Sequence, residues 1–102
     1  MVKAVALSSE IPSQGHVVID FSATWCGPCQ RIGPIYAGLE HTFPSITFLK
    51  VDVDDAEELS ASYSVQSLPT FVFLNNGVVF HRIEGADIYA VIKTLEDLMS
   101  LE

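Results

Sequence analysis

The sequence predicts an α/β fold with a central mixed sheet flanked by helices on both faces. Apolar, β-branched runs alternate with stretches of helical periodicity, a pattern typical of parallel strands joined by crossover helices. Two apolar runs joined by Asn76-Gly77 indicate a hairpin in the second half of the chain. With 102 residues, of which 49% are hydrophobic, the chain has the size and core of one domain covering residues 1–102.

A short apolar run and a broken segment precede the first buried strand. Residues 2–7 are typical of an edge strand. Pro12 and Gly15 then exclude a long helix, so the first helix is expected to be shortened to a turn. Residues 17–21 are β-branched and almost entirely apolar, as expected for a strand covered on both faces of the sheet.

An amphipathic helix follows the two cysteines. Its apolar residues recur with helical spacing on one face, and Pro34 is expected to kink it because proline removes a backbone donor. Residues 46–53 predict a second buried strand. The apolar face of the helix consists of Ile32, Ile35, Tyr36, Leu39 and Phe43.

The second half of the chain completes the sheet and the helical cover. Asp54 or Asp55 is expected to cap a short helix. Residues 70–74 and 78–80 form the two arms of the predicted hairpin, so the sheet has five strands, or a four-stranded core if the first run does not pair. An amphipathic helix ends the chain, with an apolar stripe of Ile88, Val91, Ile92, Leu95, Leu98 and Met99.

The charge and cysteine content exclude several classes of protein. Five basic residues against thirteen acidic ones give a net charge of −8, which disfavours nucleic acid and membrane partners. No stretch reaches the roughly 18 apolar residues of a membrane span, and the first apolar run is too short for a signal peptide. Two cysteines are too few for a secreted disulfide scaffold. We expect a cytoplasmic monomer, and a leader removed ahead of Met1 stays compatible with the sequence.

The stretch Trp25-Cys26-Gly27-Pro28-Cys29 predicts chemistry at the thiols. A bond between cysteines so close in sequence closes a tiny loop and adds little stability, so a structural role is disfavoured. A thiolate is the species that attacks a disulfide, and a helix start stabilises an anion. Cys26 falls at such a start and is expected to form a mixed disulfide. Cys29, one turn further in and more buried, is expected to resolve it.

Metal and haem sites share the spacing of the cysteine pair but fit this sequence less well. Structural zinc usually takes four Cys or His ligands, and His16, His41 and His81 are scattered along the chain. A c-type haem needs His directly after the second cysteine, where Gln30 stands. We therefore expect no metal and no cofactor.

Asp20 is the second candidate for chemistry, because aspartate is depleted in strands. Val18 and Ser22 share its face of the strand, so we expect its side chain beneath the turn near Cys29. Burial would raise the pKa of its carboxyl toward the range useful for proton transfer. The alternative is a solvated carboxylate at the edge of the strand.

Residues 21–29 resemble the active-site strand and turn of the thioredoxin family, and the resemblance covers about residues 16 to 100. It implies a thioredoxin fold with a mixed sheet and helices on both faces. The matching residues outside the turn are Pro34, Val51-Asp52-Val53-Asp54, Leu68-Pro69-Thr70-Phe71, Asn76-Gly77 and Gly85.

The resemblance also implies roles for two polar residues and a proline. Asp20 would take the proton from Cys29, and Lys50 matches a lysine that can pair with this aspartate, although an exposed lysine is nearly as compatible. Pro69 would be cis, lie against the cysteine pair and present the Leu68 backbone to an extended substrate. An ordinary trans proline is the alternative.

A substrate-binding surface around Cys26 follows from the same resemblance, because apolar patches commonly mark protein contacts. Gly85 would allow close approach of a backbone, and a simple turn glycine is the competing interpretation. The expected members of this surface are Trp25, Gly27, Pro28, Leu68, Pro69 and Gly85.

The function that the resemblance implies is reduction of disulfides in other proteins, such as peroxiredoxins. Electrons would come from NADPH through thioredoxin reductase. Related oxidases and isomerases commonly carry His where Pro28 stands, so Pro28 favours reduction. Gln30 departs from the Lys or Arg of many relatives, which removes a cation near the thiols. A binding module with an incidental dithiol is the alternative from another class.

Overall fold

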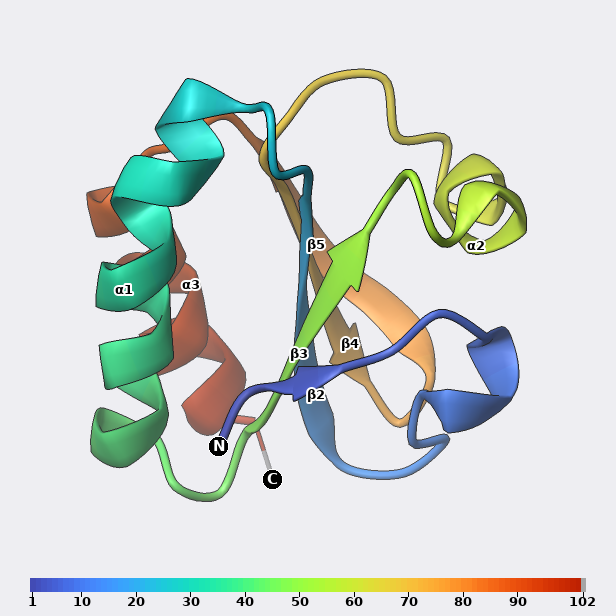
Figure 1. The fold of residues 1–102 in the computed structure, drawn as a ribbon. Helices are drawn as coiled ribbons and strands as arrows, with labels where there is room; N and C mark the ends of the chain where they lie inside the picture. Colours follow the sequence, from blue (N-terminus) through green and yellow to red (C-terminus); the bar gives the residue numbers. More distant parts are fainter. Residues whose placement is uncertain (102) are drawn as a thin grey trace.

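A mixed five-stranded sheet forms the centre of the structure, a computed structural model that describes residues 1–101 (Figure 1). The strand order is β1-β3-β2-β4-β5. β2 pairs in parallel with β3, which also pairs in parallel with β1, whereas β4 runs antiparallel to both β2 and β5. The strands are β1 (Lys3–Ala4), β2 (His16–Ser22), β3 (Thr47–Asp52), β4 (Thr70–Asn75) and β5 (Val78–Glu84).

Helices cover both faces of this sheet, as the sequence predicts. In Figure 1, α1 (Gly27–Thr42) and α3 (Ile88–Met99) lie side by side on one face, and α2 (Glu57–Ser62) lies on the other. The expected shortening of the first helix is confirmed, since only the 3₁₀ turn η1 (Ser8–Glu10) follows β1. The Glu10 carboxylate stabilises this turn by accepting the backbone N–H groups of Ala6 and Leu7, each at 2.9 Å.

The core has two halves because successive strand residues point to opposite faces. Val18 on β2 and Phe48 on β3 pack beneath α1 and α3, and Val17 and Leu49 pack toward α2. Asp20 shares the face of Val18, so a carboxylate interrupts the apolar layer just below the start of α1. This interruption places a titratable group inside the fold.

Two expectations about element ends are wrong. The edge strand expected over residues 2–7 is limited to β1, since pairing beyond it consists of one Val5 N–H bond to the Lys50 carbonyl. The cap of α2 is Ala56, which makes no side-chain bond, rather than Asp54 or Asp55. Asp54 lies two residues before this cap, and its Oδ2 accepts a bond from the Trp25 indole.

The predicted hairpin is confirmed. Asn76 (φ 52°) and Gly77 (φ 81°) form the turn in the left-handed region that this sequence pair favours. Phe80 is an extra residue in β5, because Phe73 pairs with His81 and Leu74 pairs with Val79. The helix α1 runs through Pro34 to Thr42 without a break.

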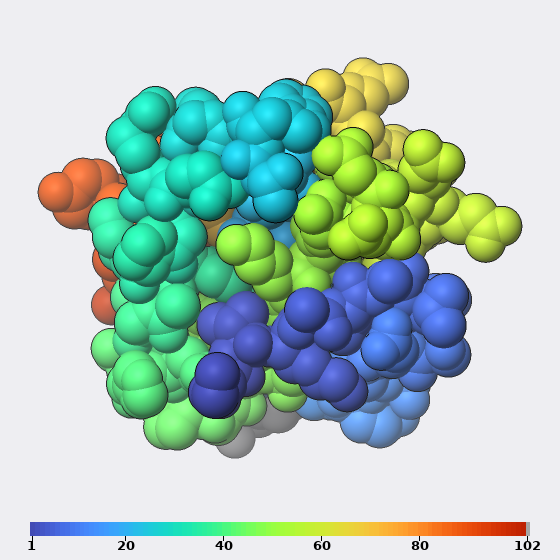
Figure 2. Space-filling model, viewed as in Figure 1, coloured from blue at the N-terminus to red at the C-terminus, as the bar shows by residue number. Residues whose placement is uncertain are grey.

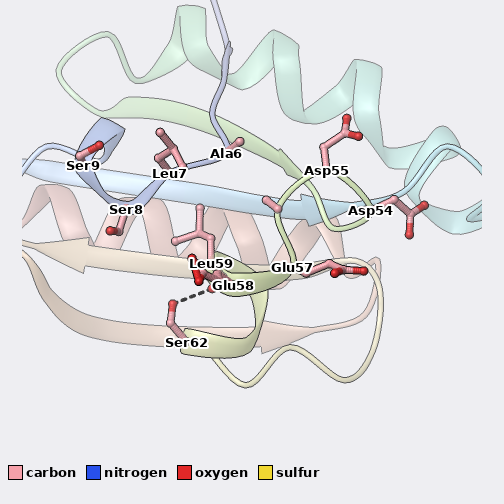
Figure 3. Close-up of a pocket in the computed structure, with 11 residues that line it drawn as sticks. Ala6, Leu7, Ser8, Ser9, Asp54, Asp55, Glu57, Glu58, Leu59 and Ser62 are labelled. Carbon is pink, nitrogen blue, oxygen red and sulfur yellow. Dashed lines mark hydrogen bonds between the residues drawn. The ribbon is translucent and has the colours of Figure 1, made fainter.

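A groove of about 740 Å³ lies between η1 and the start of α2 (Figure 3). The N-terminal segment and the segment around α2 meet on this side of the molecule in Figure 2. Carboxylates and hydroxyls line the groove, with Leu7 and Leu59 as its apolar parts, and no cysteine contributes to it. The thiol chemistry therefore lies outside this groove.

Candidate active site

Cys26 and Cys29 form a disulfide at the start of α1, beside the carboxyl end of β2 (Figure 1). Their Cα atoms are 5.3 Å apart. Cys26 is the N-cap of the helix, and its Sγ accepts the backbone N–H of Cys29 at 3.3 Å. Pro28 stands in the first turn, where its missing N–H costs nothing. Cys26 is 7% exposed and Cys29 is 1% exposed, so Cys26 is the sulfur that a partner reaches more easily.

Asp20 lies in β2 on the face covered by α1, and it is 1% exposed. Within the described part of the chain neither of its carboxylate oxygens has a hydrogen-bond partner. Burial raises the pKa of this carboxyl from 3.8 to about 6, and the positive charge of Lys50 opposes part of the rise. A carboxyl with this pKa exchanges protons close to neutral pH.

Lys50 sits directly across from Asp20 in the parallel pairing of β2 and β3. No ion pair joins the two side chains among residues 1–101, so the lysine acts on Asp20 through space. Its ammonium lies beneath α1 at Gly33, where an added Cβ would come within 3.9 Å of Lys50 Nζ. That distance is an ordinary van der Waals contact, so the ammonium lies directly against this turn of the helix.

Leu68 and Pro69 approach the cysteines from the loop before β4. The bond between them is cis, the isomer that the resemblance implies. Leu68 packs against the cluster of Ala23, Cys26 and Cys29. The Pro69 carbonyl accepts the backbone N–H of Gly85 at 2.8 Å, which joins this loop to the end of β5.

Exposed residues surround the disulfide. Trp25 is 69% exposed, and its indole Nε1 donates to Asp54 Oδ2 at 2.8 Å. Gly27 and Pro28 are exposed beside it. Gly85 has φ 110°, which a residue with a side chain rarely adopts. The structure thus brings together the residues that were predicted to bind substrate, at one end of the sheet.

Sequence reasoning missed two residues that position this site. Asp54 holds the Trp25 indole through its hydrogen bond, whereas its place in the sequence suggested only a helix cap. Tyr36 was assigned to the core by its spacing, but its buried hydroxyl also donates to the Leu49 carbonyl at 2.7 Å. This bond ties α1 to β3 close to Asp20, and burial with the nearby Asp20 charge raises the pKa of Tyr36 well above its usual range.

The arrangement defines a class of protein: an α/β redox protein with one dithiol–disulfide pair at a helix start. Cys26 is slightly more exposed than Cys29, and a carboxyl of raised pKa lies below the pair. Among residues 1–101 no group of three or more His, Cys, Asp or Glu side chains is arranged to hold a metal ion. None of the helices in that stretch is long and apolar enough to cross a membrane.

Comparison with known proteins identifies the family. The thioredoxin family model matches residues 2–97. A thioredoxin H-type from Picea mariana is 42% identical over 80 residues, which are 78% of this chain and 64% of the relative. A thioredoxin from Ictalurus punctatus is 44% identical over 86 residues, 80% of each chain. The matches span 60 to 64% of the length of the first three curated relatives.

Solved structures agree with this assignment. A thioredoxin from Plasmodium falciparum superposes with a TM-score of 0.88 at 36% identity, covering 94% of this chain and 98% of the other. A thioredoxin from Fasciola hepatica gives a TM-score of 0.86 at 38% identity, with the same coverage. The chain belongs to the thioredoxin family.

Proposed function

We propose that this chain reduces disulfides in other proteins, with Cys26 as the attacking sulfur and Cys29 as the resolving one. The observation that carries the proposal is the placement of the pair. Cys26 caps α1 and is the more exposed sulfur, whereas Cys29 is buried in the first turn. A helix start stabilises a sulfur anion through its free N–H groups and its dipole, so the cap position suits the nucleophile.

The reaction proceeds in two exchanges. In the reduced protein, the Cys26 thiolate attacks one sulfur of the substrate disulfide, a Cys26–substrate bond forms, and the second substrate sulfur leaves as a thiolate that takes a proton. Cys29 then loses its proton to Asp20 and attacks Cys26 Sγ. The Cys26–substrate bond breaks, and the substrate leaves with both sulfurs reduced. Two electrons pass from the dithiol to the substrate, and the chain ends as the disulfide seen here.

Asp20 suits the role of proton acceptor because its pKa of about 6 keeps it mostly ionised, yet basic enough to accept a proton, at neutral pH. Lys50 is proposed to favour the ionised carboxyl through its charge. The exposed Trp25 and Pro28, with the half-buried Leu68 beside them, are proposed to hold an extended segment of the substrate beside Cys26.

Recharging of the disulfide requires a reductant, and we propose NADPH acting through thioredoxin reductase in the cytoplasm. Peroxiredoxins are proposed among the substrates. One structural relative, 32% identical with a TM-score of 0.89 and 94% coverage of both chains, comes from work on thiol resolution in a yeast mitochondrial 1-Cys peroxiredoxin through glutathione and thioredoxin systems. That relationship supports the same substrate class for this chain.

Reduction of insulin disulfides tests the proposal, first with dithiothreitol and then with NADPH and a thioredoxin reductase. We expect turnover in both assays, and loss of turnover in Cys26→Ser. The reduction potential of the Cys26–Cys29 pair is measured in parallel. A protein that accelerates neither assay, or whose pair is a strong oxidant, would contradict the reductase assignment.

A further inference from the structure

Gln30 directly follows the buried cysteine, and its side chain folds back from α1 onto the loop after β2. Its Nε2 donates to the Ala23 carbonyl at 2.9 Å. The same carbonyl accepts the backbone N–H of Cys26 at 3.2 Å. One acceptor therefore holds both the turn that carries the cysteines and the Gln30 amide, which fixes the direction of this long side chain.

The fixed side chain borders a small pocket of about 90 Å³ at the carboxyl ends of β2 and β3. Gln30 is exposed, whereas Ser22 across the pocket is 1% exposed, so Gln30 forms the outer wall and Ser22 the inner one. The pocket is lined by Ser22, Ala23, Thr24, Gln30, Lys50 and Asp52.

Two unpartnered polar side chains lie on the inner side of this pocket: Ser22 lines it, and Asp20, the strand partner of the lining residue Lys50, lies behind the lining. The hydroxyl of Ser22 has no hydrogen-bond partner in the described chain, and neither has the carboxylate of Asp20 two residues earlier on the same face. Buried polar groups without partners are rare and call for water or a functional explanation. A pocket of this size, lined by a hydroxyl, an ammonium and a carboxylate, is polar and large enough to admit water.

We propose that Gln30 is a positioning residue whose side chain, anchored on the Ala23 carbonyl, walls this pocket and limits how far water reaches Asp20. The proposal deepens the proposed function, because Asp20 must release to solvent the proton that it receives from Cys29. Water that enters past Gln30 carries this proton outward along Ser22. By limiting hydration of the Asp20 carboxyl, Gln30 keeps this carboxyl a stronger base near neutral pH. The pocket still lets the proton reach solvent.

The charges around Asp20 are few, so a change in hydration should dominate its titration. Lys50 and Asp52 face the pocket from β3, and Tyr36 faces Asp20 from α1 with its hydroxyl bound to a β3 carbonyl. The cysteines are uncharged as a disulfide. On β4 the residue paired with Asp20 is the apolar Phe71.

The test is the titration of the Asp20 carboxyl, followed by carbon-13 NMR in the oxidised protein. Gln30→Ala opens the outer wall, so water stabilises the carboxylate and the Asp20 pKa should fall by about 1 pH unit. Gln30→Met keeps a side chain of similar size over the pocket but removes the hydrogen-bond donor. Its Asp20 pKa should therefore lie between those of the parent and of Gln30→Ala. Gln14→Ala, an exposed glutamine in the loop before β2, is the matched control and should titrate like the parent.

An Asp20 pKa in Gln30→Ala equal to that of the parent would overturn the proposal, as would equal shifts in the Ala and Met variants. The titration needs no turnover, so it separates this inference from the proposed function. If insulin reduction fails while the Asp20 pKa shifts in Gln30→Ala, the reductase assignment is wrong and the proposed role of Gln30 is still supported. In an active protein the midpoint of the pH–rate profile should move downward together with the Asp20 pKa.

Discussion

The backbone N–H of Cys29 donates to Cys26 Sγ at 3.3 Å, across the first turn of α1. Cys26 is the N-cap of that helix, so its sulfur occupies the position in which a capping oxygen usually accepts such a bond. When the disulfide opens, the same donor and the helix dipole favour negative charge on Cys26. The asymmetry between the two sulfurs thus comes from the backbone, and it leads to the first prediction.

Cys29→Ser should trap mixed disulfides between Cys26 and partner proteins, because the attacking sulfur remains while the resolving one is gone. Cys26→Ser should trap almost none, since Cys29 is only 1% exposed. The measurement is non-reducing electrophoresis of tagged variants after incubation with thiol-oxidised protein extract. Equal trapping by both variants would refute the division of roles.

Asp20→Asn should slow reduction of insulin and remove the rate change centred near pH 6, because the amide cannot accept a proton from Cys29. General-base catalysis contributes about 10²–10⁴-fold when the base acts in the limiting step. The measurement is the pH–rate profile of Cys29-dependent turnover in both proteins. Identical profiles would show that Asp20 is not the proton acceptor.

The same substitution should change how stability depends on pH. Asp20 has a raised pKa in the fold, so between pH 3.8 and about 6 the folded chain binds more protons here than the unfolded chain. Its contribution to the free energy of unfolding therefore falls as pH rises through this window, by about 3 kcal/mol in all. Asp20→Asn lacks this fall. In denaturant titrations of the oxidised proteins, the free energy of unfolding of the variant should rise relative to that of the parent from pH 4 to 7. A difference that stays constant over this range would contradict the prediction.

Asp54→Ala should weaken substrate binding by releasing the Trp25 indole from its bond at 2.8 Å. The bond is exposed and is worth about 1 kcal/mol, so KM for a protein disulfide should rise by a factor of about 5 while kcat stays near the parent value. Asp55→Ala removes an equal charge from an exposed neighbour without a side-chain bond to Trp25 and serves as the control. A matching rise in KM in both variants would assign the effect to charge alone.

Tyr36→Phe should lower the free energy of unfolding by about 1–3 kcal/mol, because the Leu49 carbonyl loses a buried donor that ties α1 to β3. Tyr89→Phe changes a tyrosine that is 83% exposed and should stay within about 0.5 kcal/mol of the parent. Urea unfolding of both variants measures the difference. If Tyr36→Phe unfolds at the parent's urea concentration, the hydroxyl contributes nothing to the packing of α1.

The elements that could be predicted from the sequence are those in which one local signal acts alone. Asn76-Gly77 requires left-handed backbone angles and turns the hairpin where expected. The alternation of strands and helices indicated the layers, and Pro12 indicated the missing first helix. Asp20 stood out because a carboxylate inside an apolar strand must have a use or a partner.

The remaining features depend on contacts between distant segments, which spacing does not encode. Asp54 or Asp55 was expected to cap α2, but Ala56 is the cap, and the Asp54 carboxylate accepts a bond from the indole of Trp25, 29 positions earlier. For Lys50 the sequence left open a pairing with Asp20 or an exposed lysine, and the ammonium extends beneath Gly33 without an ion pair to Asp20 among the described residues. The role of Gln30 depends on its rotamer and on a carbonyl seven residues back, so its identity in the sequence suggested only a lost cation.

Two backbone hydrogen bonds of the turn that carries the cysteines do not involve the sulfur atoms. The Ala23 carbonyl accepts the Cys26 N–H, and the Cys26 carbonyl accepts the Gln30 N–H at 3.1 Å, so we expect these contacts to persist when the disulfide opens. We therefore expect the oxidised and the reduced protein to have almost the same surface. A binding partner must then distinguish the oxidised from the reduced protein by the chemistry of one sulfur atom. Replacement of an oxidised molecule by a reduced one at the partner therefore requires no refolding.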